Sequence, residues 1–527
     1  MNMEQSATLA GGAFAVDVLV LGGGPAGAWA AIEAAERGAT VALADKGRVG
    51  TSGATAAVNT AVIDVAPNSA ARAAVIERRL EKGSDLARGD WIERMVDEAH
   101  AKLHRLGEWG YVFPTDDRGA LYRGNLRGPD YMQLLRRRLH KLRVRLLDQS
   151  PALELLHADG VVAGASGVDR RTGEGWIVRA GSVVIATGGC AFMSKALGTY
   201  GLTGDGLLMA AEAGAVLSGL EFSGQYGVAH VDATVTKNLP YGWATFTNAA
   251  GGTLIGDDIF ELLAEHLPAG PVYAMIDKAA PDIQEALRRG QPNIFLALDR
   301  QGIDPFRQRF PVNLRYEGTV RGVGGLTINA GGATSVSGLY AAGDAASREP
   351  VVGAVSGGGG PNSTWAIASG AWAGRSAAAY AKKLGRHLHD RPAHALGQAG
   401  LSGEGSADMA DVSDCIKAVQ AEMFPLDRNF SRDGDAMRSS VVRLDEAWRG
   451  VRNMGGLRQN GKALYRSREA AAMAATARWI YAGALARPES RGIHRRRDYQ
   501  MMDMAQSRRL ETRGLDEITV RPSVGTP

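Results

Sequence analysis

The chain has 527 residues, which is too long for one hydrophobic core and predicts about two to four domains. Its 45% hydrophobic and 22% charged residues are typical of a globular protein, and a formal net charge of +4 is too small to indicate nucleic-acid binding. The two cysteines, Cys190 and Cys415, exclude a disulfide scaffold and an iron–sulfur cluster held within the chain, and they favour a cytoplasmic protein.

The N-terminal segment is typical of a folded domain rather than of a signal peptide. Residues 1–15 lack a basic n-region, and no stretch of the chain has the roughly 18 uninterrupted apolar residues of a membrane span, so we expect none. Asp17–Leu21 is a short apolar run that predicts a buried parallel strand, and Gly22–Gly27 (GGGPAG) then supplies G-x-G-x-x-G before a helix-forming stretch. In this motif Gly22 allows the tight turn, Gly24 lets the backbone approach a pyrophosphate, and Gly27 permits close helix–strand packing.

A second apolar run, residues 40–44, ends on Asp45. An acid at this point is placed to accept hydrogen bonds from an unphosphorylated ribose, which predicts FAD or NAD. The alternative is a tight turn with no ligand, and the complete order of strand, glycines, helix, strand and acid disfavours it. The small, glycine-rich segment 47–65 follows, and we expect its backbone to contact the cofactor, with an ordinary loop as the alternative.

Later stretches repeat the pattern of a strand followed by glycine. Ser182–Gly189 (SVVIATGG) and Gly338–Asp344 (GLYAAGD) both end in this way, and a second G-x-G-x-x-G, expected of a disulfide-type reductase, is missing. This spacing suits a large flavin fold with inserted segments, so FAD is favoured over NAD. Before these two stretches, Ala152–His157 and Gly160–Ala165 predict a hairpin.

Helical patterns occupy much of the remaining chain. Tyr131–Leu147 predicts a basic helix whose arginines form a solvated face over a buried stripe, with docking of an acidic partner as the alternative. Asp408–Phe424, Asp435–Met454 and Tyr465–Ala486 have apolar residues three or four apart, which predicts a small helical bundle.

These motifs together resemble those of a known superfamily. The sequence is similar to the flavoprotein subunits of the succinate dehydrogenase/fumarate reductase superfamily, which also holds L-aspartate oxidase and the adenylylsulfate reductase alpha subunit. The likeness covers nearly the whole chain, and its motifs, in order, are the N-terminal glycine motif, SVVIATGG, TGDGLLMAAEAGAVLSGLEF at 203–222, GLYAAGD, PNSTWAIASGAWAGRSAA at 361–378 and ESRGIHRRRDY at 489–499.

The resemblance implies an α/β fold in which a doubly wound, Rossmann-like FAD-binding domain carries an inserted α+β capping domain and a C-terminal helical domain. The expected FAD-binding parts are residues 1–226 and 320–385, and the capping domain is residues 227–319. The helical domain is expected at 400–500 and a tail at 501–527.

The resemblance also implies the residues that hold the FAD. Covalent members of the superfamily carry a histidine in the segment written here SGATAAVN, which has none, so the FAD is expected to be non-covalent. The expected cofactor-binding residues are Gly22, Gly24, Pro25, Ala26, Gly27, Asp45, Lys46, Thr51, Ser52, Gly53, Thr187, Gly188, Gly343, Asp344, Asn362 and Ser363.

Departures from the superfamily pattern concern the substrate. Positions that hold arginine or histidine in dicarboxylate enzymes here read Thr253, Tyr226, Val320 and, in the stretch 353–361, glycine. We therefore expect a substrate other than succinate or fumarate, with at most one carboxylate. A local likeness to the adenylylsulfate reductase alpha subunit, at Val58-Asn59-Thr60 and at YGWATFTN, points to Asn59 as an active-site residue.

The leading hypothesis is an FAD-dependent oxidoreductase that transfers hydride between a small organic substrate and flavin N5, with Asn59, Tyr226 and Arg321 as candidate catalytic residues and no metal site. The alternative is a flavin electron-transfer subunit that works with a separate ferredoxin-like iron–sulfur protein. A flavin-binding scaffold without chemistry is the third hypothesis.

Overall fold

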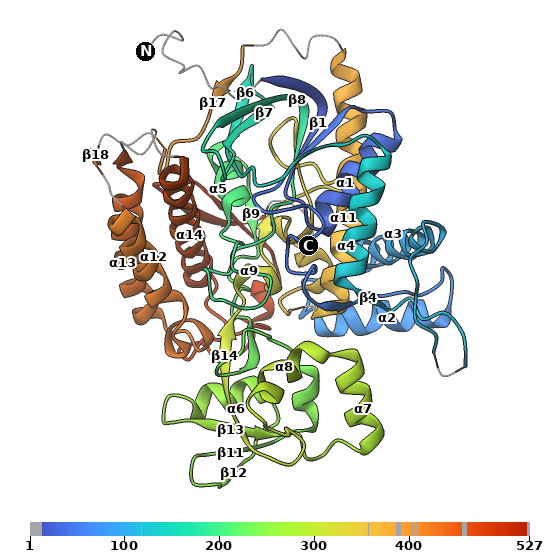
Figure 1. Ribbon diagram of the computed structural model, residues 1–527. Coiled ribbons are helices and arrows are strands. Elements are labelled where there is room, and N and C mark those ends of the chain that lie inside the picture. Colours follow the sequence, from blue (N-terminus) through green and yellow to red (C-terminus); the bar gives the residue numbers. More distant parts are fainter. Residues whose placement is uncertain are drawn as a thin grey trace.

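The structure, a computed structural model, describes residues 13–116, 118–356, 358–385, 392–401, 405–406, 409–455 and 461–523. The first and last residues of the expected domains, 1–12 and 524–527, lie outside these ranges. The fold is the mixed α/β architecture that the sequence predicted, with a C-terminal helical domain (Figure 1).

The central layer is an eight-stranded sheet in the order β17-β6-β7-β8-β1-β2-β5, with β16 paired to β8. The strands β5, β2, β1, β8 and β16 run parallel, whereas β6, β7 and β17 pair antiparallel, and β6–β7 confirms the predicted hairpin. Their bounds are β1 Phe14–Leu21, β2 Val41–Ala44, β5 Arg145–Leu147, β6 Ala152–Ala158, β7 Val161–Val168, β8 Gly175–Ile185, β16 Leu339–Ala341 and β17 His394–Ala395.

Helices cover this sheet, and two of them, α1 and α11, cross each other very closely. A Cβ at Gly370 or Gly374 of α11 would lie 2.4 or 2.2 Å from a backbone oxygen of α1, so only glycine permits this contact. The basic helix α4 buries Tyr131 and Leu135, as predicted, but it ends at Lys141 and β5 takes up Arg145–Leu147. The helices and strands of this layer are α1 Pro25–Glu36, α2 Ala70–Lys82, α3 Gly89–Glu108, α4 Gly128–Lys141, α5 Asp205–Glu212, α9 Gly318–Arg321, α10 Glu349–Val352, α11 Gly359–Leu384, β3 Asn59–Ala61 and β4 Asn125–Arg127.

The inserted segment forms its own antiparallel sheet in the order β10-β14-β13-β11-β12. Every second residue of β14 is buried, so Phe310, Val312 and Leu314 lie on one face of the strand and pack into the core with the helices of the segment. Figure 1 shows this part at the end of the molecule away from the eight-stranded sheet. Its elements are β10 Tyr226–His230, β11 Thr245–Thr247, β12 Thr253–Leu254, α6 Ile259–His266, β13 Val272–Met275, α7 Pro281–Gly290, α8 Pro292–Arg300 and β14 Phe310–Tyr316.

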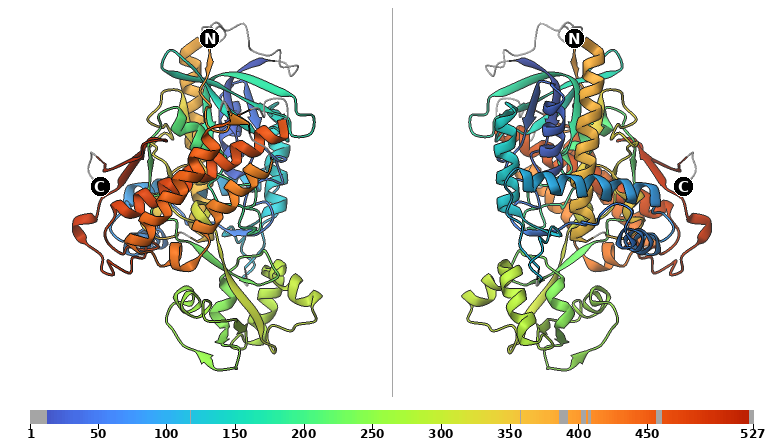
Figure 2. Two further views of the ribbon diagram at one scale, coloured as in Figure 1. Left: turned by 90° about the vertical axis from the view of Figure 1, so that its left-hand side faces the viewer. Right: turned by 90° about the vertical axis from the view of Figure 1, so that its right-hand side faces the viewer.

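The C-terminal part contains the predicted helices and a sheet that was not predicted. Helices α12 Met409–Met423, α13 Gly434–Arg452 and α14 Gly461–Ala486 pack together, and Leu444 and Trp448 of α13 are buried between them. Part of the expected tail folds as β20 Leu510–Arg513 and β21 Thr519–Pro522, which extend β15 Gly325–Leu326 and β9 Leu217–Ser218 into a four-stranded sheet. Figure 2 shows this red segment running along the outer side of the molecule. The short strands β18 Gly405–Ser406 and β19 Met454–Gly455 pair with each other.

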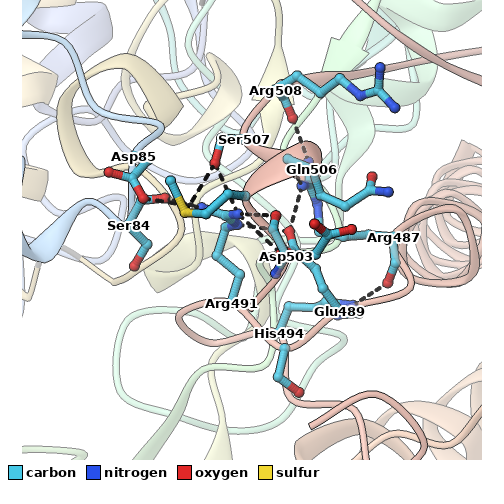
Figure 3. Close-up of polar contacts among 12 residues, drawn as sticks. Ser84, Asp85, Arg487, Glu489, Arg491, His494, Asp503, Gln506, Ser507 and Arg508 are labelled. Atoms are coloured by element: carbon cyan, nitrogen blue, oxygen red, sulfur yellow. Dashed lines mark hydrogen bonds and ion pairs between the residues drawn. The ribbon is translucent and has the colours of Figure 1, made fainter. Parts of the chain in front are cut away.

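A buried ionic cluster fastens the C-terminal segment to the loop between α2 and α3 (Figure 3). Arg491 donates to Glu489 and to the backbone oxygens of Ser84 and Asp503, so one guanidinium joins three parts of the chain. Arg487 pairs with Glu489 at 3.0 Å and with Glu221 at 2.9 Å. Since these side chains are fully buried, loss of one partner would leave an uncompensated charge, which costs about 3–5 kcal/mol.

Within the described ranges, none of the helices has the length and apolarity that crossing a membrane requires. The same residues contain no group of three histidine, cysteine or acidic side chains arranged to hold a metal ion.

Candidate functional site

A cavity of about 350 Å³ opens where the parallel strands β1, β2 and β8 end. This edge of a parallel sheet, in front of the first helix N-terminus, is where doubly wound folds bind nucleotides. The cavity extends from Lys46, Arg170 and Tyr465 at one end, past the glycine loop, to Lys237 and Arg321 at the other.

The three motif glycines have two kinds of environment: Gly22 and Gly27 lie against backbone, whereas Gly24 faces open space. A Cβ at Gly22, where φ is +107°, would lie 2.2 Å from the carbonyl oxygen of Ala186, and a Cβ at Gly27 would lie 1.9 Å from that of Gly22. These two glycines therefore permit the close contact of backbone with backbone. A Cβ at Gly24 would meet no protein atom within 4 Å, because it points into the cavity. Gly24 is thus the position where a ligand, and not the protein, requires glycine.

The N-terminus of α1 lies behind Gly24, and no side chain caps it. Free backbone N–H groups and the positive end of the helix dipole therefore face the cavity, which suits a diphosphate. The N-terminus of α11 likewise has no side-chain cap, and Gly359, Asn362 and Ser363 of its first turns line the cavity.

Asp45 lies at the end of β2 as expected, and it also organises the glycine loop. Its carboxylate accepts hydrogen bonds from the backbone N–H of Gly23 at 2.7 Å, from that of Gly47 at 2.7 Å and from the hydroxyl of Ser52 at 2.6 Å. The neighbouring Lys46 pairs with Asp205 at 2.6 Å and Glu469 at 3.2 Å. The end of the cavity at Lys46 is thus built from segments more than 400 residues apart.

Among the described residues that line the cavity, two buried polar side-chain atoms have no protein partner. They are the hydroxyl oxygen of Thr187 and the side-chain oxygen of Asn362. Because a buried polar group without a hydrogen bond costs free energy, both atoms have the capacity for a further partner. The open Gly24 position, the uncapped helix α1 and these two atoms together fit a bound dinucleotide.

Asp344 reaches the cavity from the turn after β16, and Arg348 holds it in an ion pair. Arg348 is itself buried and donates to the backbone oxygens of Gly322, Thr319 and Val320. Burial raises the pKa of Asp344, and the adjacent Arg348 acts in the opposite direction. The carboxyl group is therefore fixed in place with capacity to accept further hydrogen bonds from a sugar alcohol chain.

The far end of the cavity combines apolar, hydroxyl and cationic side chains. Val58 and Val320 line it, and the hydroxyls of Thr60 and Ser363 are hydrogen-bonded to each other. Lys237 and Arg321 supply the cations. Lys237 was not predicted, because no motif marks a single lysine in the segment TVTKN.

Most of the expected cofactor-binding residues line the cavity, and two do not. Gly27 packs against Gly22 instead, and Thr51 is exposed to solvent. Near Lys46 the cavity is also lined by Arg170, Tyr465 and Glu469, which carry no local motif. The residues that reach the cavity as expected are Gly22, Gly24, Pro25, Ala26, Asp45, Lys46, Ser52, Gly53, Thr187, Gly188, Gly343, Asp344, Asn362 and Ser363.

The structure brings one of the three candidate catalytic residues, Arg321, to the cavity. Asn59 lies beside it, but its side chain turns away and donates to the carbonyl oxygen of Gly290 at 2.8 Å. Tyr226 is 1% exposed and lies outside the cavity wall, where its ring packs against Tyr316 and Phe430. Burial holds the pKa of Tyr226 well above its ordinary value, and its ring contacts are those of a core residue.

Comparison with known families supports this site. Residues 17–233 match the family described as FAD binding domain, and residues 428–513 match the family described as Fumarate reductase flavoprotein C-term. L-aspartate oxidase of Mycobacterium tuberculosis is 27% identical, over 95% of this chain and 96% of its own length.

Solved structures show the same fold over the whole chain. The quinol fumarate reductase of E. coli superimposes with a TM-score of 0.82 at 20% identity, covering 97% of each chain. The adenylylsulfate reductase of Archaeoglobus fulgidus gives 0.76 at 17% identity, covering 99% of this chain and 97% of that one. The chain therefore belongs to the succinate dehydrogenase/fumarate reductase flavoprotein superfamily and is an FAD-dependent oxidoreductase.

Proposed function

We propose that the enzyme holds FAD non-covalently in the cavity and exchanges hydride between the flavin and a small organic substrate other than succinate or fumarate. The ADP half would lie along Gly24 and Asp45, the ribityl chain near Asp344, and the flavin ring towards Val58 and Val320. When bound, the flavin supplies hydride acceptance or donation at N5, while the protein supplies position and charge.

The observation that carries this proposal is the charge at the substrate end of the cavity. Lys237 and Arg321 are the two cations there, and Arg321 already pairs with the fully buried Glu317 at 3.4 Å. The charge of Lys237 is therefore the one that has no carboxylate partner among the described residues. A dicarboxylate brings two negative charges out of water, and each needs a cation or several donors. The cavity is therefore suited to a substrate with one carboxylate.

Of the positions where the chain differs from dicarboxylate enzymes, some line the cavity and support the proposal, and others lie away from it. Val320 lines the cavity, so an apolar side chain stands where such enzymes carry histidine. Tyr226 is buried outside the cavity, and Thr253 lies exposed on β12, the outermost strand of the inserted sheet. The proposal therefore rests on Val320 and the charge balance, and not on Thr253. L-aspartate, the substrate named for the relative above, also carries two carboxylates and is disfavoured by the same argument.

The contacts of the inserted segment with the cofactor-binding loop favour an enzyme whose substrate is enclosed. The amide of Asn293 donates to the carbonyl oxygen of Ala57 at 2.9 Å, and Asn59 donates to Gly290 as described. These bonds hold the inserted segment over the end of the cavity. Excluding water there strengthens electrostatic interactions with the substrate.

An electron-transfer role with a separate ferredoxin-like iron–sulfur protein is the second candidate. It is favoured by the cysteine content, since Cys190 and Cys415 are both buried and the chain has no others to bind a cluster. Rapid turnover with oxygen alone would support an oxidase, whereas turnover that requires a reduced or oxidised ferredoxin would support the second candidate.

The proposal is tested by anaerobic bleaching of the bound flavin with matched mono- and dicarboxylates. We expect bleaching at 450 nm with one or more 2-amino or 2-hydroxy monocarboxylates, or reoxidation of the reduced enzyme by their oxidised counterparts. Bleaching by dicarboxylates alone would contradict the charge argument.

A further inference from the structure

Two cations from different parts of the chain face the same end of the cavity. Lys237 lies in the loop after β10, and its ammonium donates to the carbonyl oxygen of Asn59 at 3.0 Å. Arg321 lies at the end of α9. Among the described residues no carboxylate forms an ion pair with Lys237, so its charge has no partner of its own.

We propose that Lys237, together with Arg321, binds the single carboxylate of the substrate and so determines that the enzyme accepts a monoanion. This inference rests on the proposed function. The segment that carries Lys237 belongs to the inserted domain, while Asn59 in β3 and Arg321 in α9 belong to the part of the chain built around the eight-stranded sheet. The carboxylate would thus be held at the contact between the two.

The surroundings of Lys237 make this anion site dependent on pH. Burial, and next the nearby charge of Arg321, lower the pKa of Lys237 to about 8, and Glu317 opposes this. The other charged pair at this end, Asp344 with Arg348, is already neutral as a unit. A bound carboxylate favours the charged ammonium, so binding takes up a proton wherever free Lys237 is neutral. Affinity for a monoanion should therefore fall about tenfold per pH unit above about pH 8.

The test measures binding to the FAD-loaded protein with simple probes at constant ionic strength. Propionate, its neutral analogue propionamide, and succinate are titrated while the flavin absorption spectrum is recorded between about pH 7 and pH 9.5. We expect propionate to perturb the spectrum and to bind at least about tenfold more tightly than either of the other two, with affinity that declines above about pH 8.

Three variants make the assignment specific. Lys237→Met should weaken propionate binding at least about tenfold and remove its pH dependence. Lys237→Arg should retain affinity within about threefold and also lose the pH dependence, because a guanidinium stays charged. Lys278→Met is the matched control, since Lys278 also bonds a backbone carbonyl of the inserted domain, at 3.2 Å, yet does not line the cavity.

The outcomes separate this inference from the proposed function. Propionate binding that is absent at about 100 mM, independent of pH, or unchanged in Lys237→Met overturns the role of Lys237 when the same sample is fully loaded with FAD. A preparation that takes up no FAD at all overturns the proposed function itself.

Discussion

Gly24→Val should separate binding of the cofactor from folding of the chain. The backbone at Gly24 is extended, with φ −71° and ψ −177°, so valine can adopt it. Its Cβ would meet no protein atom within 4 Å, and the new side chain would occupy the cavity in front of the uncapped helix α1. The protein should fold, while the diphosphate loses the space it needs.

The magnitude follows from the cost of overpacking. Forcing a side chain into a filled site costs about 1–3 kcal/mol, which corresponds to roughly fivefold to 150-fold weaker FAD binding. A matched variant, Gly27→Ala, adds one methyl group 1.9 Å from the carbonyl oxygen of Gly22, between two backbone segments that cannot both give way. It should destabilise the fold itself by about 3 kcal/mol or more.

The assay measures FAD affinity by fluorescence quenching and stability of the FAD-free proteins by thermal unfolding. We expect Gly24→Val to unfold near the temperature of the unsubstituted FAD-free protein and to bind FAD weakly. Gly27→Ala should unfold at a clearly lower temperature. Normal FAD affinity in Gly24→Val, or equal loss of stability in both variants, would refute the assignment of Gly24 to the diphosphate.

Three further predictions concern the linkage between flavin and protein, the buried Tyr226 and the pH dependence of stability. Acid precipitation should release all of the flavin as FAD, since residues 52–59 contain no histidine; flavin left in the pellet would contradict this. Tyr226→Phe removes a hydroxyl whose hydrogen bond to the carbonyl oxygen of Met423 is long, at 3.5 Å, so the free energy of unfolding should change by at most about 1 kcal/mol and turnover should stay the same. A large fall in kcat at full FAD content would restore Tyr226 to the site. Burial, with Glu221 adjacent, raises the pKa of Glu349 from 4.5 to about 7, so the stability it contributes is present below about pH 4.5 and is lost as pH rises through about 7. Glu349→Gln should therefore flatten the decline of Tm between about pH 4.5 and pH 7, and an unchanged slope would argue against this.

The parts of the site that local sequence could predict are those built by one continuous segment. Strand β1, the glycine loop and α1 follow each other directly, and a strand of buried apolar residues followed by G-x-G-x-x-G has few other structures available. The helices of the bundle were also predictable, because their apolar spacing is regular. The ends differ by a few residues, as at α13, which the structure ends at Arg452.

Residues that the tertiary fold brings to the cavity could not be predicted in this way. Lys237 faces the site because the inserted sheet returns its loop to Asn59, and Tyr465 does so because α14 packs beside α5. Tyr226 lies outside the cavity wall for the same reason. Its position next to a motif suggested the substrate, yet the register of β10 on β14 turns its ring to Tyr316 in the core. The β20–β21 strands were missed because charged residues interrupt their apolar pattern.

The most direct test of the account is a pair of steady-state assays on the FAD-loaded enzyme, with succinate plus an artificial electron acceptor and with fumarate plus reduced viologen. The charge at Lys237, Arg321 and Glu317, with Val320 on the cavity wall, suits one carboxylate and not two. We predict turnover below about 0.1 per second in both directions, about a hundredfold under the enzymatic median of about 10 per second. Turnover near that median with either dicarboxylate would contradict the account.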